Sequence, residues 1–213
     1  MSTTQSSGLS GRRQQAAQND GIILDAAREV FLADPKAPVS AVAKRAGVGI
    51  SALYRRYPGK EDLLRHLCHE GLRRYNAEAE AALQEPDAAA AFTGFVERVV
   101  DADVHSLTVH LAGTFTPTAE MGADAMRANE LATTLLSRAK DAGAVREDAV
   151  PQDIGLALEA CSAIRAPDAT RTRELRRRVL AMLLRTLSTV EDAPLPGPAP
   201  RPGELSGRWK PEN

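Results

Sequence analysis

The sequence predicts an all-α protein of about nine helices, and three observations lead to this fold class. Apolar residues recur three and four positions apart from Asp20 to Val190, which is the spacing of helices that bury one face. No segment shows the alternation of apolar and polar residues that marks a half-buried strand. Aromatic residues make up only 4% of the 213 residues, so we expect a core of closely packed small and aliphatic side chains.

The first four predicted helices are set apart by glycine and proline. The first runs from Asp20 to the Asp34–Pro35 pair, where proline cannot continue a helix. Two short helices follow, at 39–46 and 50–57, with Gly47 between them. A long amphipathic helix then begins at Lys60 and stops before Pro86.

Five further helices are predicted from capping residues. Asp87 is a typical N-cap for a helix whose pattern weakens near His105 and resumes up to Phe115. The next helix spans 119–142 and ends at Gly143, and Pro151 suits the first turn of a helix that ends near Arg165. The last runs from about 168 to 190.

Composition changes at both ends of the chain. Residues 1–19 are rich in Ser, Thr and Gln and are expected to form a disordered arm, whereas residues 191–213 alternate proline with other residues, which favours an extended, disordered tail. Between them we expect a first helical domain at 20–66, which includes a motif at 38–57, and a second helical domain at 67–190.

The segment 39–57 has the spacing of a helix-turn-helix unit. Two helices can cross over a short turn when the packing position is small and the turn tolerates positive φ, and Ala43 and Gly47 meet these needs. Apolar residues at 42, 46, 48 and 53 then fill the wedge between the helices. The side chains left to face a major groove are those of Ile50, Ser51, Ala52, Arg55 and Arg56.

The charge distribution favours DNA binding over the alternative that this segment is only a turn between core helices. The formal net charge of −1 is the sum of a basic N-terminal part and an acidic remainder: residues 1–75 hold 12 Lys and Arg against 7 Asp and Glu. The remaining residues hold 15 against 21, so the basic charge lies with the helix-turn-helix.

Two stretches, ILDAAREVF ending at Phe31 and VSAVAKRAGVGISALYRRYPGKEDLL at 39–64, resemble the N-terminal domain of TetR/AcrR-family transcriptional regulators. The family pattern T-x-x-x-I-A-x-x-A-G-V, then L-Y-x-H-F, then K-E-x-L corresponds here to Pro38, Val42-Ala43, Ala46-Gly47-Val48, Leu53-Tyr54, Arg56-Tyr57 and Lys60-Glu61-Asp62-Leu63. The rest of the chain resembles the family only in length and helical layout.

The resemblance implies roles for individual residues. Tyr54 and Lys60 would hold phosphates, and the start of the recognition helix would meet base edges. Pro38 replaces the usual Thr, so Ser40 is expected to supply the missing hydroxyl, and Gly49 replaces the usual Ser or Thr cap. Lys44, Gly49 and Tyr57 complete the candidate DNA contacts, and Arg56 replaces the usual His with a fixed charge.

The resemblance also implies an effector cavity among the middle helices and a dimer interface formed by the last two. Most apolar residues of the middle helices are expected to be core, with some lining the cavity; the candidates are Phe92, Phe95, Val99, His105, His110, Phe115 and Met126. The candidate interface residues are Ala157, Leu158, Cys161, Leu175, Val179, Met182 and Leu183.

Several classes of protein are disfavoured. There is no run of about 18 apolar residues, no apolar signal segment, and no CxxC pair, so we expect a cytoplasmic protein without disulfides. His66, Cys68 and His69 lack a third ligand on one helix face, so neither a metal nor a cofactor is expected. No GxSxG, Walker or HExxH motif supports an enzyme.

The expected function is that of a homodimeric transcriptional repressor that binds a palindromic operator and leaves it when a small-molecule effector binds. The alternatives are a constitutive DNA-binding regulator without an effector and an interaction module that uses the proline-rich tail.

Overall fold

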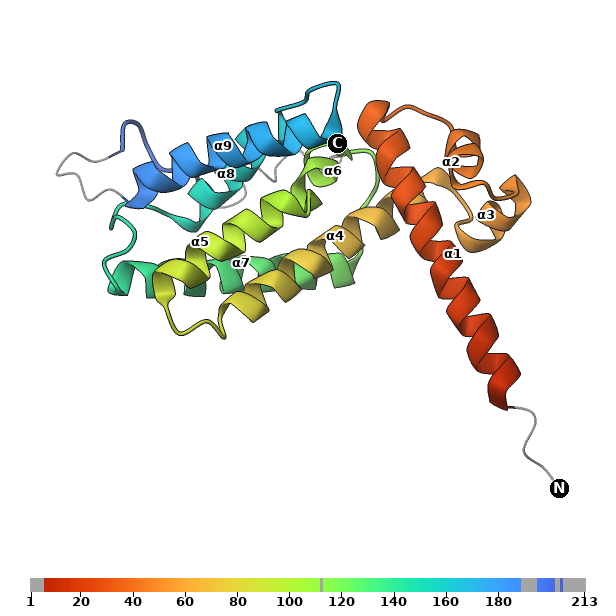
Figure 1. Cartoon of the computed structure of the whole chain (residues 1–213), viewed down its shortest axis with the longest axis horizontal. Coiled ribbons are helices and arrows are strands. Elements are labelled where there is room, and N and C mark those ends of the chain that lie inside the picture. Colours follow the sequence, from red (N-terminus) through yellow and green to blue (C-terminus); the bar gives the residue numbers. More distant parts are fainter. Residues whose placement is uncertain (1–5, 112, 189–194, 202–203, 205–213) are drawn as a thin grey trace. The chain divides into compact units, whose positions relative to one another are not determined.

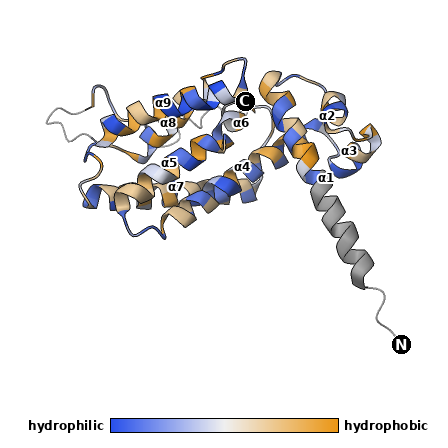
Figure 2. Cartoon of the chain, viewed as in Figure 1, coloured by the Kyte–Doolittle hydropathy of each residue, from blue (hydrophilic) through white to orange (hydrophobic). Residues whose placement is uncertain are grey.

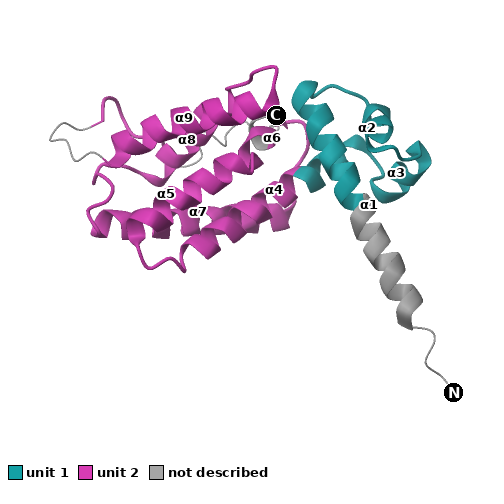
Figure 3. Ribbon diagram, viewed as in Figure 1, with its two compact units in different colours: residues 1–67 teal, residues 68–213 magenta. Residues whose placement is uncertain are grey.

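The computed structural model describes residues 6–111, 113–188, 195–201 and 204, with side chains from Asp20 onward except at 108–110. These residues form nine helices and no strand, as predicted (Figure 1). They fall into two compact units, residues 1–67 and 68–213, and the boundary lies inside the long helix α4, Lys60–Ala82 (Figure 3). Among the described residues, no helix combines the length and the hydropathy needed to cross a membrane.

Unit 1 contains α1 (Ser6–Ala33), α2 (Val39–Ala46), α3 (Ile50–Arg56) and the first turns of α4. Its core forms where apolar residues of these helices meet, as the periodicity predicts. The fully or almost fully buried members are Ile23, Leu24, Ala27, Phe31, Val42, Leu53, Leu63, Leu64 and Leu67. Helix α1 packs against α2, and α2 packs against α3, so α2 links the other two helices of this unit.

Helix α1 begins earlier than the composition predicts. The structure makes residues 6–19 helical, where disorder was expected. The segment RRQQAAQ at 12–18 consists of residues with good helix propensity, and it continues directly into the helix anchored by the unit 1 core. Extending an existing helix avoids the cost of nucleation, and composition alone does not reveal this. Residues 1–5 lie outside the described part of the chain.

Unit 2 contains the rest of α4 together with α5 (Ala88–Asp101), α6 (Val104–Leu111), α7 (Ala119–Asp141), α8 (Pro151–Ser162) and α9 (Ala169–Ser188). Helix α5 is central, since it contacts α6, α7, α8 and α9. Its buried face carries Phe92, Phe95, Val96 and Val99, and the ring of Phe95 meets that of Tyr75 edge to face at 5.1 Å. Figure 2 shows both apolar and polar residues on each of these helices, as expected for helices that bury one face.

Local signals correctly locate several helix ends in unit 2. The Asp87 carboxylate accepts hydrogen bonds from the backbone N–H groups of Ala89 and Ala90 at 2.9 and 3.1 Å. Gly143 has the left-handed φ of 67°, which ends α7, and Pro151 opens α8. Helix α8 stops at Ser162, three residues before the predicted end.

One residue of the proline-rich tail, Leu195, packs against the helices of unit 2. The backbone N–H of Leu195 donates to Asp148 Oδ2 at 2.8 Å, and the Leu195 side chain lies against the hydrophobic core. The side chain of Arg146 and then the Leu195 N–H lower the pKa of Asp148 to about 2, so this carboxylate keeps its charge until the pH falls well below 4. The expected disorder therefore does not apply at Leu195; most of 191–213, including Trp209, lies outside the described residues.

Candidate nucleic-acid interface

The turn between α2 and α3 has the geometry that a helix-turn-helix needs. Gly47 adopts φ 67° and ψ 25°, and the N–H of Val48 reaches back to the carbonyl of Ala43 at 3.0 Å. This hydrogen bond closes the end of α2, and the left-handed residue redirects the chain at once into α3. The predicted role of Gly47 is confirmed. Pro38 and Gly49 begin α2 and α3 without a side-chain cap, as their residue types predict.

Helix α3 is held by one side and presents the other to solvent. Leu53 is fully buried where α3 packs against α2; of the other residues predicted to fill the wedge, Val42 is fully buried and Ala46 and Val48 are half-buried. The predicted contact residues of α3 that are exposed are Ile50, Ser51, Ala52, Tyr54, Arg55 and Arg56. On α2, Ser40 and Lys44 are also exposed. The structure therefore brings these residues to the surface of one small unit, with small side chains at the start of α3.

Tyr57 is not part of this surface, and its prediction as a DNA contact is wrong. Only 5% of the residue is exposed, and its ring lies 5.5 Å from that of His66. Tyr57 follows Leu53 by four positions and its N–H donates to the Leu53 carbonyl at 2.8 Å, so it continues the inward face of α3. The four-residue spacing from Leu53 was the sequence signal that predicted burial of Tyr57.

Lys60 also has a different role from the one that the family pattern implied. Its ammonium donates to the carbonyls of Pro35 and Ala37 at 2.9 and 2.8 Å and lies 5.2 Å from the centre of the Phe31 ring. The side chain thus fastens the first turn of α4 to the loop that leads into α2. In this structure Lys60 positions the helix-turn-helix and does not present its charge to a phosphate.

Two carboxylates of α1 that the sequence did not single out contact the basic residues of this unit. Glu29 pairs with Arg45 at the end of α2, and Asp20 pairs with Arg56 at the end of α3. The partners are 16 and 36 residues apart in the chain, so no local pattern identifies them. Lys44 and Arg55 have no ion-pair partner among the described residues.

The effector candidates lie mostly in the packed core of unit 2. Phe92, Phe95, Val99 and Phe115 are buried and His105 is half-buried. Val99 and His105 border a cavity of about 10 Å³, which is room for about one water molecule. Met126 is 66% exposed, so its prediction as a pocket residue is wrong: it lies on the outer face of α7. The side chain of His110 lies outside the described residues.

The dimer candidates divide into two groups. Ala157, Leu158 and Cys161 are buried within their own chain, so their prediction as interface residues is wrong. Burial raises the pKa of the Cys161 thiol, in keeping with a core position. On α9, Leu175, Val179 and Leu183 are half-buried and Met182 is 54% exposed, which leaves an outer apolar stripe. The outer face of α8 carries Leu156 and Ala160 instead.

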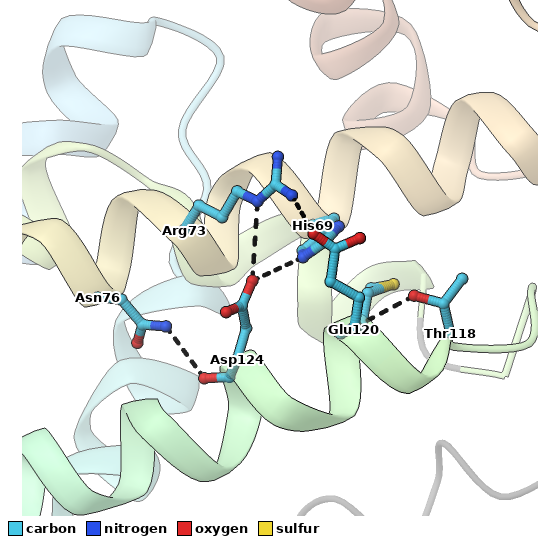
Figure 4. Close-up of polar contacts among 7 residues, drawn as sticks. His69, Arg73, Asn76, Thr118, Glu120 and Asp124 are labelled. Carbon is cyan, nitrogen blue, oxygen red and sulfur yellow. Dashed lines mark hydrogen bonds and ion pairs between the residues drawn. The ribbon is translucent and has the colours of Figure 1, made fainter.

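Within unit 2, polar side chains join α4 to α7 (Figure 4). Asp124 of α7 lies 2.7 Å from His69 Nε2 and 3.7 Å from Arg73 Nε, both on α4. Asn76 donates to the backbone carbonyl of Asp124 at 3.0 Å, and Arg73 also pairs with Glu120. Three successive turns of α4 are therefore fixed to one side of α7. Among the described residues, no three His, Cys, Asp or Glu side chains are grouped to hold a metal.

Comparison with known families agrees with this geometry. Residues 23–67 match the sequence model of the bacterial regulatory proteins of the tetR family. Residues 87–189 match that of the C-terminal domain of SbtR-like transcriptional regulators. Together the two regions cover more than half of the chain, and the chain belongs to the TetR family of transcriptional regulators. No curated protein matches the sequence significantly.

Solved structures of other transcriptional regulators share the fold. A TetR transcriptional regulator from Streptomyces coelicolor is 25% identical, with 81% of this chain and 99% of that one covered and a TM-score of 0.58. LfrR from Mycobacterium smegmatis, solved with proflavine, is 24% identical over 84% and 99%, with a TM-score of 0.61. FadR from Bacillus subtilis, solved with stearoyl-CoA, is 17% identical over 76% and 96%, with a TM-score of 0.54.

The role of Lys60 leads to a stability prediction. Lys60→Met keeps the aliphatic stem but removes the ammonium from two carbonyls, and it should lower the free energy of unfolding by about 1–2 kcal/mol. Lys44→Met removes the same charge from an exposed, unpaired position and should change stability by less than about 0.5 kcal/mol. Urea unfolding followed by circular dichroism measures both. Equal stability of the two variants would contradict the positioning role of Lys60.

Proposed function

We propose that this TetR-family regulator is a homodimeric repressor that binds a palindromic operator and is released by a small-molecule effector. The observation that carries the DNA-binding part is the exposed face of α3, where Ile50 is exposed, Ser51 and Ala52 are small enough to allow close approach, and Tyr54 and Arg55 extend from the same short helix. Small residues admit the helix to a major groove, and the Tyr hydroxyl and the Arg guanidinium supply donors for phosphates and base edges.

A second copy of the chain is the partner proposed for the outer faces of α8 and α9. Met182 and Leu156 are exposed, and Leu175, Val179 and Leu183 lie half-buried beside Met182 on one side of α9. Two helices from each copy would bury these apolar residues in a symmetric four-helix contact. A dimer places two copies of α3 for two major-groove half-sites about one helical turn apart.

Release by an effector is supported by the path of α4 and by the ligands of two structural relatives. Helix α4 begins in unit 1 and continues into unit 2, where Asp124 and Glu120 fix it to α7. An effector that moves α7 would therefore act directly on α4. LfrR was solved with proflavine and FadR with stearoyl-CoA, so an apolar or aromatic effector is the class that we propose. The effector must bind the two states with different affinity.

The packing of unit 2 favours one alternative, a constitutive DNA-binding regulator. Phe95 is fully buried, Phe92 and Val99 almost so, and the cavity of about 10 Å³ beside Val99 has room for no more than about one water molecule. An effector would have to open this core before binding. A panel that includes proflavine and a long-chain acyl-CoA separates the two functions: a bound effector raises the Tm and weakens DNA binding, whereas a constitutive regulator shows neither change.

The DNA face is tested with duplexes that the purified protein retains from a random library. Arg55→Ala should weaken binding about tenfold or more, because each dimer loses two guanidinium contacts, and Tyr54→Phe should weaken it by a smaller factor. Arg173→Ala, an exposed arginine of α9, removes the same charge and should leave affinity nearly unchanged. Gel-shift titrations measure all three. If Arg55→Ala binds as tightly as the control, α3 is not the reading helix.

The dimer surface is tested by two matched substitutions of exposed methionines. Met182→Glu places a charge in the α9 stripe and should shift the protein from dimer to monomer, because a carboxylate is costly to bury in an apolar contact. Met126→Glu makes the same change on α7 and should leave the dimer intact. Sedimentation velocity distinguishes one chain of 22.8 kDa from two. A dimer of unchanged strength with Met182→Glu would place the interface elsewhere.

A further inference from the structure

The basic side chains around α3 are not equally available to DNA. Lys44, Arg45, Arg55, Arg56 and Lys60 carry the positive charge of α2, α3 and the first residue of α4. Lys60 is held by two backbone carbonyls, Arg45 by Glu29 and Arg56 by Asp20. Only Lys44 and Arg55 of this set have no hydrogen-bond or ion-pair partner among the described residues. Formal charge therefore overstates the charge that can meet phosphates.

The two arginine pairs have a common construction. In each pair, the guanidinium of an arginine in the last turn of α2 or α3 contacts a carboxylate of α1. More than half of the arginine side chain stays exposed. The carboxylates differ, since the side chain of Glu29 is 56% exposed and that of Asp20 only 19%. Asp20 is thus fixed in unit 1, whereas both arginines can turn outward to another anion.

A phosphate and a carboxylate compete for the same guanidinium. An arginine–carboxylate pair has little net charge, so it attracts few phosphates and contributes little to the salt dependence of binding. Exposed ion pairs are weak in water, so a phosphate can displace the carboxylate. Breaking the ion pair nevertheless costs free energy, and this cost reduces the net free energy gained when the arginine binds phosphate. Each pair therefore lowers the affinity for the backbone of any DNA duplex.

We propose that Asp20 and Glu29 act as internal competitors of the DNA phosphates for Arg56 and Arg45. They set the affinity and the salt dependence of the reading unit without touching DNA. Only the unpaired Lys44 and Arg55 then contribute their full charge from α2 and α3. The inference rests on the proposed DNA-binding function and adds two residues, both on α1, that neither the helix-turn-helix pattern nor the family match assigns a role.

The test uses full-length Asp20→Asn and Glu29→Gln variants and a short duplex of random sequence. Fluorescence anisotropy gives the Kd over a range of NaCl concentrations. Each substitution should tighten binding about three- to tenfold at low salt and should steepen the slope of log affinity against log salt by about two per dimer, one for each released arginine. Thermal unfolding shows whether each variant is folded, and Asp20→Glu should restore wild-type binding.

Asp25→Asn is the matched control. Asp25 lies on α1 between the two carboxylates, is exposed, and has no ion-pair partner among the described residues. Its substitution makes the same change in net charge without releasing an arginine, so its salt slope should stay near that of the wild type. An Arg56→Gln background supplies the second control, because Asp20→Asn should then have no further effect on affinity.

The outcomes separate the inference from the function on which it rests. In one outcome, wild-type binding weakens with salt, but Asp20→Asn and Glu29→Gln bind no more tightly than Asp25→Asn. This result would overturn the inference and leave the DNA-binding function standing. An Asp20→Asn effect that persists with Arg56→Gln would overturn the pairing of these two residues. If neither the wild-type chain nor the variants bind this duplex or library-selected duplexes, both the inference and the DNA-binding function are overturned.

Discussion

The left-handed turn at Gly47 is the constraint on which the DNA-binding unit depends. A residue with a Cβ is strained at φ 67°, and without this turn α2 could not end and α3 begin within three residues. The turn sets α3 against α2, and burial of Leu53 fixes which side of α3 faces solvent. The exposure of Tyr54 and Arg55 is therefore a consequence of the turn and of the core behind it.

Local signals in the sequence were sufficient for the fold and for the helix-turn-helix. Gly47, Asp87, Gly143 and Pro151 act within one turn of a helix end, so residue type alone predicts their effect. One group of errors arises where a side chain's partner is distant in the chain. Lys60 meets the carbonyls of Pro35 and Ala37, and no spacing rule shows whether an ammonium will find a phosphate or a carbonyl. Tyr57 is a different case, since its four-residue spacing from Leu53 already indicated burial.

The assignment of the α8 faces failed for another reason. Helix α8 is apolar on both sides, with Leu158 and Cys161 facing the core and Leu156 and Ala160 facing outward. Periodicity identifies a helix with one buried face, but it cannot say which of two apolar faces packs within the chain. On α9 the inward side carries a charged residue, Arg176, which is buried and pairs with Asp103. The sequence pattern therefore does not identify this side as the buried one. Met182 and its neighbours lie on the outward side.

Sequencing the DNA duplexes that the purified protein retains from a random library tests the central claim most directly. A dimer with one exposed α3 per chain predicts inverted repeats whose half-sites are centred about one helical turn apart, and loss of these repeats when Arg55 is replaced by Ala. Single, unrepeated sites would contradict the dimeric arrangement. Recovery of no common sequence would contradict the claim that α3 reads DNA bases.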